Sequence, residues 1–171
     1  MTLQWIEEVP RGRLCVLPRP KGGDYLEEEI RAWSQAGVNL VASLLEPEET
    51  SRFELVREAE LCMTHGIQFL SYPIPDHDVP RSKMATFSFA LELSRALSQD
   101  KSVVIHCFAG LGRSVMMGGC VLALGGMPPD VAFERIATAR GVPFVPEMEA
   151  QREWVEEFYE HLNRTRRPGP R

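Results

Sequence analysis

The chain has 171 residues, of which 44% are hydrophobic and 25% charged, and its formal net charge is −5 at pH 7. This length suits one domain with a single core, and the composition is that of a soluble globular protein rather than a disordered one. The acidic balance argues against a general nucleic-acid binder, which is usually basic.

In the first half of the chain, hydrophobic periodicity predicts strands and helices in alternation. In chain order we expect a strand at 12–18, a helix at 25–33, a strand at 38–45, a helix at 50–64 and a strand at 67–74. The helix at 50–64 has Thr50 or Ser51 as its expected N-cap, and Gly66 lies beyond its end as a stop signal.

The second half begins with "PIPDHDVP" (73–80), which we expect to be an irregular loop because its prolines break regular structure. There follow an expected helix at 81–99, a strand at 102–106 and helices at 113–125, 129–140 and 147–163. The segment "RTRRPGPR" (164–171) is basic and rich in helix breakers. We therefore expect a single domain over 1–163, followed by a flexible tail.

Strands separated by helices predict an α/β fold with a mostly parallel central sheet of about four to five strands, flanked by helices. In such sheets, ligands bind beyond the carboxyl ends of the strands. Two loops lie at such ends, "PDHDVP" (75–80) and "CFAGLG" (107–112). Both are therefore candidate site loops.

The four cysteines, at positions 15, 62, 107 and 120, form no CxxC pair, and the four histidines add no set with ligand spacing. We therefore expect no metal site, and reduced thiols in the cytoplasm, with access to the nucleus left open. The N-terminus lacks the apolar core of a signal peptide, and the longest uncharged apolar run, 115–127, is shorter than the roughly 20 residues of a membrane span. We expect no membrane association.

The stretch "HCFAGLGRS" (106–114) places a cysteine at the end of a strand and an arginine at the start of a helix. Gly110 and Gly112 allow the loop between Cys107 and Arg113 to curl, so that successive N–H groups and the helix N-terminus face one hollow. Such a hollow favours both a thiolate at Cys107 and a bound phosphate, and Arg113 would grip two phosphate oxygens. Ser114 would donate to the sulfur as it leaves.

The alternative interpretation is a buried strand-end cysteine, because cysteine is common there as a small apolar residue. A buried loop would not need Arg113, whose charge is costly without an anion. The stretch is not a nucleotide-binding GxxxxGK[ST] loop, since no lysine precedes Ser114. The chemistry favours the phosphate pocket.

A phosphate ester that reacts there also needs a proton donor for its leaving group. The loop 75–80 offers Asp76, His77 and Asp78, although Asp and Pro are also common in simple solvated turns.

"HCFAGLGRS" resembles the HCxxGxxR[ST] signature of the cysteine-dependent protein tyrosine phosphatase superfamily. Pro73, Asp76 and Pro80 are similar to the P-x-x-D-x-x-x-P general-acid loop of its compact dual-specificity members, those of the cyclin-dependent-kinase-associated kind. Asp76 lies 31 residues before Cys107 (107 − 76), near the family spacing, whereas Asp78 does not fit the pattern. The resemblance extends over roughly residues 12–163.

The resemblance implies a phosphotyrosine-phosphatase-like fold and a reaction in two steps without metal or cofactor. Cys107 attacks phosphorus while Asp76 protonates the leaving oxygen; Asp76 then activates water, with Arg113 stabilising both steps. His106 is expected to orient the loop through a hydrogen bond, and Gln151 to help place the water. The implied phosphate-binding residues are Phe108, Ala109, Gly110, Leu111, Gly112 and Arg113.

The expected substrate is a phosphorylated protein, with phosphotyrosine and also phosphoserine or phosphothreonine accepted by a shallow cleft, and the protein is expected to be a monomer. The loop has no lysine, which disfavours polyphosphorylated lipids and RNA 5′ ends as substrates. These non-protein phosphomonoesters stay as alternatives. A small-molecule oxyanion enzyme of the arsenate reductase kind and a phosphoprotein-binding pseudoenzyme are the remaining ones.

Overall fold

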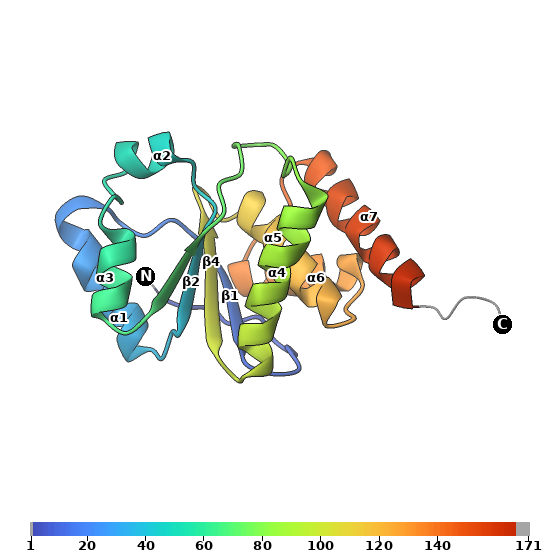
Figure 1. Ribbon diagram of the computed structural model, residues 1–171, viewed down its shortest axis with the longest axis horizontal. Coiled ribbons are helices and arrows are strands. Elements are labelled where there is room, and N and C mark those ends of the chain that lie inside the picture. Colours follow the sequence, from blue (N-terminus) through green and yellow to red (C-terminus); the bar gives the residue numbers. More distant parts are fainter. Residues whose placement is uncertain (1, 167–171) are drawn as a thin grey trace.

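The computed structural model describes residues 2–166. Its strands are β1 (Arg13–Pro18), β2 (Leu40–Ser43), β3 (Gln68–Ser71) and β4 (Ser102–Cys107). Its helices are α1 (Leu26–Gln35), α2 (Pro47–Arg52), α3 (Glu58–Thr64), α4 (Lys83–Ser98), α5 (Arg113–Leu124), α6 (Pro129–Arg140) and α7 (Glu149–Arg166), with a 3₁₀ turn at Gly23–Tyr25 before α1 (Figure 1). Outside the region 50–64, the expected order of strands and helices is confirmed.

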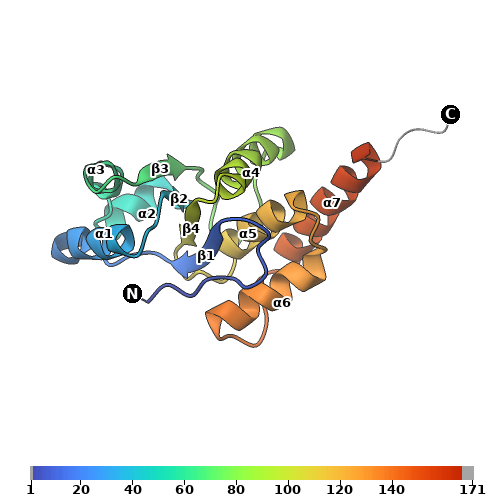
Figure 2. The ribbon, with the colours of Figure 1, turned by 90° about the horizontal axis from the view of Figure 1, so that it is seen from below.

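The four strands form one parallel sheet in the order β1-β4-β2-β3. Helices α1 and α3 lie on one side of this sheet, and α4 to α7 lie on the other (Figure 2). Each side has its own buried apolar cluster, one centred on Trp33 and Ile30 and the other on α5, which is buried along nearly its whole length. This is the α/β architecture expected from the sequence.

The sheet brings three chain segments together at its carboxyl end. Strand β4 is buried at every position and lies between β1 and β2. In its register Cys107 lies opposite Pro18 of β1, and His106 lies opposite Ser43 of β2. The loop after β3 and helix α2 lie at the same end, at the top of Figure 1. Residues far apart in sequence therefore meet beside Cys107.

The single helix expected over 50–64 is wrong, because the structure has two helices there. Helix α2 begins earlier, at Pro47, since proline suits the first helical turn. Its N-cap is Glu46, in a reciprocal capping box with Glu49, and not Thr50 or Ser51. Between the two helices Glu54 adopts a left-handed φ of 56°, which interrupts the helical path.

The last helix, α7, continues to Arg166 and so includes the first three residues of the segment expected to be a tail. The rest of that segment, 167–171, lies outside the described residues. Across residues 2–166, no helix is both long enough and apolar enough to cross a membrane.

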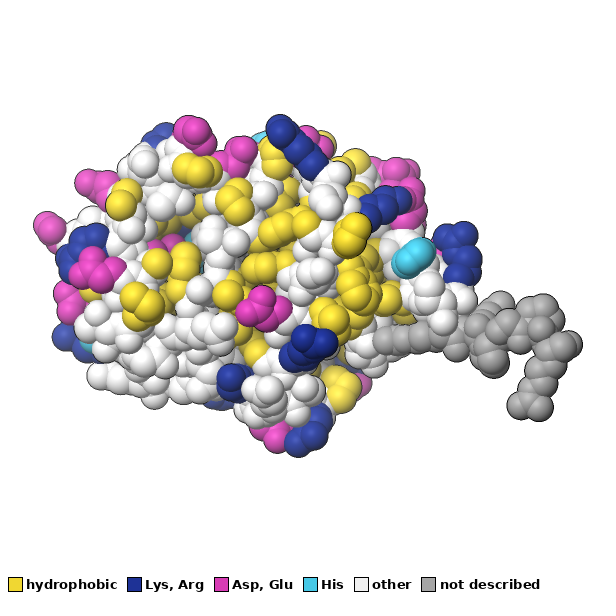
Figure 3. Space-filling model, viewed as in Figure 1, with side chains coloured by type: hydrophobic (Ala, Val, Ile, Leu, Met, Phe, Trp, Pro, Cys, Tyr) yellow, Lys and Arg dark blue, Asp and Glu magenta, His cyan; other side chains and the backbone are white. Residues whose placement is uncertain are grey.

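The segment that follows β3 is anchored on α4 by aromatic contacts. Tyr72 stacks on Phe89 with 4.9 Å between ring centroids, and its hydroxyl lies 2.8 Å from the Thr86 hydroxyl. Phe87, on the same helix, packs against Phe158 of α7 with 6.1 Å between ring centroids. Figure 3 shows apolar side chains gathered across the middle of this face of the molecule, with charged groups mostly around them. These contacts fix where the loop 73–80 begins.

Candidate active site

The loop between β4 and α5 is held from outside through its carbonyl groups. Four consecutive carbonyl oxygens accept hydrogen bonds: those of Phe108, Ala109, Gly110 and Leu111. The backbone N–H groups of Arg19 and Glu147 donate to the first and last, at 3.1 and 3.0 Å. The Arg140 guanidinium donates to the middle two, at 3.4 and 3.2 Å.

With its carbonyls bonded outward, the loop leaves its N–H groups free for a ligand. In the described part of the chain, the N–H groups of residues 108–112 have no hydrogen-bond acceptor. The N-terminus of α5, at Arg113, adds its unpaired donors and its partial positive charge at the same place. Free amides converging with a helix N-terminus form a site for a tetrahedral anion.

Glycine is required at position 110 by both conformation and space. Gly110 has a φ of 71°, in the left-handed region. A Cβ there would lie 2.4 Å from the Pro18 nitrogen and 2.5 Å from the Leu17 carbonyl carbon. The loop 107–113, which we call the catalytic loop after the chemistry that the sequence leads us to expect, therefore curls closely against the end of β1.

Cys107 and Ser114 face each other across this loop. The Cys107 sulfur lies 3.2 Å from the Ser114 hydroxyl oxygen, and both residues are buried. A hydroxyl at this distance can donate to a thiolate and stabilise negative charge on the sulfur. All four cysteines are free thiols.

The Arg113 guanidinium is buried and ion-paired. Its two terminal nitrogens donate to the Glu49 carboxylate at 2.6 and 2.8 Å, and one also donates to the Ile74 carbonyl at 2.9 Å. Burial alone would raise the pKa of Glu49, but the hydrogen bonds from Arg113 and from the Glu46 backbone outweigh it and hold that pKa below its ordinary value. The positive charge of Arg113, which the sequence alone leaves without a partner, is thus neutralised by the Glu49 carboxylate.

The two candidate acids of the loop 73–80 differ in their surroundings. An oxygen of Asp76 lies 2.9 Å from Arg113 Nη2, and the carboxylate is 39% exposed. Asp78 instead accepts a hydrogen bond from the neighbouring Val79 N–H at 2.8 Å. His77 has a positive φ of 56°. Its Nδ1 lies 3.5 Å from an Asp76 carboxylate oxygen, and its Nε2 lies 3.9 Å from a Glu147 carboxylate oxygen. The structure brings Asp76 to the arginine and leaves Asp78 in a local turn.

His106 does not contact the loop in the expected way. Its ring nitrogens form no hydrogen bond in the described residues, and its Nε2 lies 2.8 Å from a carboxylate oxygen of Glu58, which is also buried. The expected hydrogen bond from this ring to the loop is therefore corrected: the ring faces α3. Its backbone carbonyl accepts from Leu44 N–H at 3.0 Å, which joins β4 to the end of β2.

Gln151 is fully buried at the start of α7 and lies against the catalytic loop. Its amide nitrogen donates to the Asp78 carbonyl at 3.1 Å, while its Oε1 has no partner among the described residues. A Cβ on Gly112 would lie 2.8 Å from that oxygen. One polar atom of Gln151 is thus left for a ligand or water beside the loop.

Three residues that contact the candidate site were missed by sequence reasoning: Glu49, Glu58 and Arg140. Glu49 directly precedes the helix expected over 50–64, whereas Glu58 and Arg140 lie in helices expected to flank the sheet, and nothing in their local sequence marks them. The capping motif at Glu46–Glu49 could have shown where α2 starts, but not that Glu49 also reaches Arg113.

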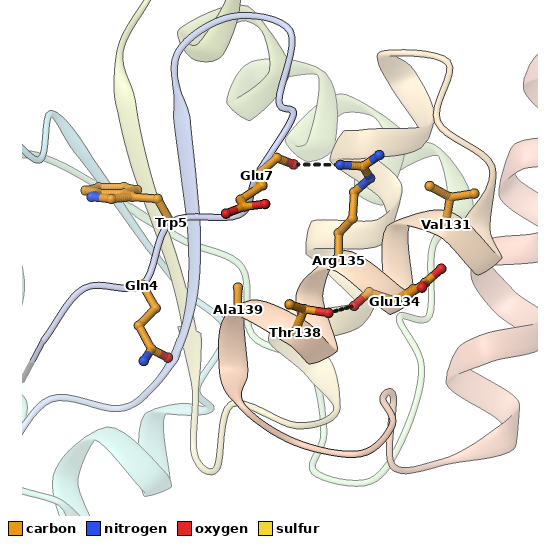
Figure 4. A pocket seen from close by; sticks show the side chains of 8 residues that line it. All are labelled: Gln4, Trp5, Glu7, Val131, Glu134, Arg135, Thr138 and Ala139. Carbon is orange, nitrogen blue, oxygen red and sulfur yellow. Dashed lines mark hydrogen bonds between the residues drawn. The ribbon is translucent and has the colours of Figure 1, made fainter.

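A separate surface pocket of about 450 Å³ lies between the N-terminal segment and α6 (Figure 4). It contains no residue of the catalytic loop. Its cation, Arg135, is already paired with the Glu8 carboxylate and donates to the Glu7 carbonyl at 3.3 Å. The chemistry described above is thus confined to the carboxyl end of the sheet.

Comparison with known proteins gives three findings. The family described as "Polymorphic toxin system, DSP-PTPase phosphatase" matches residues 15–126. Cyclin-dependent kinase inhibitor 3 of Rattus norvegicus is 25% identical over 154 residues, which cover 87% of this chain and 72% of the relative. The solved structure of kinase associated phosphatase (KAP) superposes with a TM-score of 0.78 at 20% identity, covering 95% of this chain and 96% of that one.

A further solved structure, PTPMT1 in complex with PI(5)P, superposes with a TM-score of 0.70 at 21% identity and covers 91% of this chain and 94% of that one. At these identities, the two solved structures show a shared fold. The match over residues 15–126 extends from β1 through the catalytic loop and α5.

Proposed function

The chain belongs to the DSP-PTPase family, and hence to the cysteine-dependent protein tyrosine phosphatase superfamily, and we propose that it hydrolyses phosphate monoesters of proteins through a phosphocysteine intermediate. The observation that carries the proposal is the loop 107–113: a buried cysteine at the centre of unbonded amides, closed by an arginine. Phosphotyrosine is the proposed main substrate, and phosphoserine and phosphothreonine are further ones.

In the first step, the Cys107 sulfur uses its electron pair to form a bond to phosphorus, and the bond between phosphorus and the ester oxygen breaks. Asp76 gives its proton to that oxygen, so that a neutral alcohol or phenol leaves. In the second step, the Asp76 carboxylate takes a proton from water as the water attacks phosphorus. The sulfur–phosphorus bond breaks, and the thiolate and inorganic phosphate are released.

The negative charge that develops in both transition states is stabilised by hydrogen-bond donors of the catalytic loop and of Arg113. Arg113 Nε has no partner among the described residues and can donate to one equatorial oxygen, and Nη2 can donate to a second when the phosphate displaces its contact with Asp76. The free amides of the loop donate to the remaining phosphate oxygens. The Ser114 hydroxyl, 3.2 Å from the sulfur, stabilises the thiolate as it leaves in the second step. The unpartnered oxygen of Gln151 is placed to accept a hydrogen bond from the attacking water.

Asp76 is the proposed acid because it lies next to the arginine that holds the phosphate. The contact of 2.9 Å between these side chains means that a bound phosphate and Asp76 share one neighbour. Asp78 is already engaged with its own backbone turn. The proposal places the reaction in the cytoplasm, where the catalytic thiol stays reduced.

A second candidate substrate is a phosphoinositide. It is supported by the shared fold with PTPMT1, whose structure was solved in complex with PI(5)P. The loop itself supports the protein substrate better, since residues 108–112 carry no charged side chain to meet further phosphates.

The experiment is hydrolysis of p-nitrophenyl phosphate, of phosphotyrosine and phosphothreonine peptides, and of short-chain phosphoinositides by the purified chain. We expect vanadate to inhibit all activity and Cys107→Ser to abolish it. Activity that survives Cys107→Ser would contradict the mechanism. A phosphoinositide turned over faster than any peptide would replace the protein substrate with the second candidate.

A further inference from the structure

The outer rim of the catalytic loop carries a surface of two phenyl rings and two guanidinium groups. Phe108, the residue after Cys107, stacks on Phe53 with 4.9 Å between ring centroids and 7° between ring planes. The guanidinium carbons of Arg19 and Arg52 lie 4.3 and 4.7 Å from the centroid of the Phe53 ring. We call these four residues the rim cluster.

The fold explains why this cluster adjoins the catalytic loop. Arg19 directly follows β1 and Phe108 directly follows β4, and these two strands are neighbours in the sheet. The Arg19 N–H donates to the Phe108 carbonyl at 3.1 Å, which joins the two strand ends. Phe53 comes from the C-terminal end of α2, which also lies at the carboxyl end of the sheet. Phe108 is 42% exposed, so the cluster is accessible from solvent beside the catalytic loop.

Both arginines retain donors for a ligand. Arg19 donates one terminal nitrogen to the Pro20 carbonyl at 3.0 Å, and its buried Nε has no partner. Arg52 is exposed. Neither forms an ion pair with a carboxylate in the part of the chain that the structure describes, in contrast to Arg113. Stacking on Phe53 holds the guanidinium planes while their edge N–H groups stay available.

We propose that the rim cluster is a second anion subsite, which binds the carboxylate of an Asp or Glu next to the phosphorylated residue of a protein substrate. The inference rests on the proposed phosphoprotein function and names the sequence context that the site selects. A planar guanidinium matches a carboxylate with two parallel hydrogen bonds. Two such groups contact Phe53, whose ring stacks on Phe108, the residue after Cys107. The phenyl rings would cover the apolar part of the phosphorylated side chain.

The chemistry of the cluster favours a peptide over an inositol ring. The hydroxyl groups of a polyol need hydrogen-bond partners when they are covered, and phenyl rings provide none. A peptide presents apolar carbon to Phe53 and Phe108 and its carboxylates to the arginines.

The test uses two phosphotyrosine peptides of equal length, one with Asp and Glu beside the phosphotyrosine and the other with Asn and Gln. The measured quantity is the ratio of their kcat/KM values for each enzyme variant, which cancels changes in the chemical step. We expect a ratio of about ten for the wild type, falling toward one in Arg19→Gln/Arg52→Gln. The ratio should also decrease with added salt, since the contacts are near the surface.

The control variant is Arg95→Gln, at the end of α4 farthest from the catalytic loop, which should keep the wild-type ratio. Arg52→Gln alone should lower the ratio, and because Arg52 is exposed this variant tests the inference even where Arg19→Gln fails to fold. A wild-type ratio near one, or a ratio unchanged in the double variant, overturns the proposal.

Failure of this inference is distinguishable from failure of the proposed function. Equal turnover of both peptides contradicts the subsite and leaves the phosphoprotein function intact. Hydrolysis of p-nitrophenyl phosphate with no turnover of either peptide contradicts the phosphoprotein function. A phosphoinositide with two phosphates that outcompetes the acidic peptide, and loses that advantage in the double variant, assigns the rim cluster to a second phosphate and overturns the peptide assignment.

Discussion

Glu49 holds Arg113 through two hydrogen bonds of 2.6 and 2.8 Å, although the two residues are 64 positions apart in the chain. Both side chains are buried, and Arg113 also contacts Asp76. The ion pair fixes the guanidinium where the catalytic loop needs it before any phosphate is bound. Under the proposed mechanism, the pair therefore contributes to stability and also holds Arg113 ready for phosphate.

We expect Glu49→Gln to lower the free energy of unfolding by about 3 kcal/mol, because it leaves a buried arginine with only part of its compensating charge. Activity should fall as well, since Arg113 is no longer held in place. Urea unfolding measures the first effect and p-nitrophenyl phosphate hydrolysis the second. Glu48→Gln, an exposed neighbour on α2, should change neither; an equal loss there would mean that α2 as a whole is sensitive.

The same pair predicts a dependence of stability on pH. The pKa of Glu49 is held below its ordinary value of 4.5, so between these two pKa values the unfolded chain binds more protons than the folded one. The stabilisation is therefore complete above the ordinary value and is lost as the pH falls through the lowered one. Urea midpoints from about pH 3 to 6 should show this loss in the wild type and a flatter curve in Glu49→Gln.

Separate substitution of Asp76 and Asp78 distinguishes the roles of the two loop acids. Asp76→Asn should reduce kcat by roughly 10²- to 10⁴-fold for substrates with a poor leaving group, because the leaving oxygen then has no proton donor. The loss should be smaller for p-nitrophenyl phosphate, whose leaving group needs less protonation. Asp78→Asn is the matched control. If that variant shows the larger loss instead, the acid is misassigned.

Ser114→Ala should slow the second chemical step more than the first. The hydroxyl lies 3.2 Å from the Cys107 sulfur, where it stabilises the departing thiolate. We expect steady-state turnover to fall by up to about 100-fold and phosphocysteine to accumulate. Rapid-mixing experiments should then show a burst of p-nitrophenol. Ser88→Ala, exposed on α4, is the control, and absence of a burst with slow turnover would place the role of Ser114 in the first step.

Gly110→Ala tests how closely the loop packs against β1. A Cβ there meets backbone atoms at 2.4 and 2.5 Å, so the loop must move, and we expect at least a roughly 100-fold loss of activity. Gly126→Ala separates this collision from backbone strain. Gly126 also has a positive φ, of 91°, but no atom lies within 4 Å of its Cβ position. That variant should lose only about 1–2 kcal/mol of stability and keep its activity.

Thiol reactivity should single out Cys107. Burial raises the pKa of Cys15 to about 11, and burial together with the nearby Glu58 carboxylate raises that of Cys62 to about 12. Burial raises the pKa of Cys120 as well. At neutral pH these thiols stay protonated and unreactive. Mass spectrometry after brief iodoacetamide treatment should find one modified cysteine in the native protein and four in denaturant; rapid labelling of Cys62 would contradict this expectation.

The order of strands and helices was predictable because local hydrophobic patterns encode it. The strand 102–106 and the following "CFAGLG" turn are both read from adjacent residues, and both are present. The prediction of a single helix over 50–64 was wrong because the apolar residues of this region suit a helix throughout. The break at Glu54 depends on one backbone angle, its positive φ. The ring of His106 was also misplaced, since the partner that it faces, Glu58, comes from that same region.

The family, the parallel α/β fold and the loop with its cysteine and arginine could be predicted from the sequence, because these depend on residues close together in the chain. The side chains that surround that loop became known only from the folded chain. Glu49, Arg140 and the rim cluster come from segments that the register of β1, β4 and β2 brings to one edge of the sheet. Pairing of charges and rings at that edge acts over a few ångströms in space, and no local pattern records which distant residues those distances join.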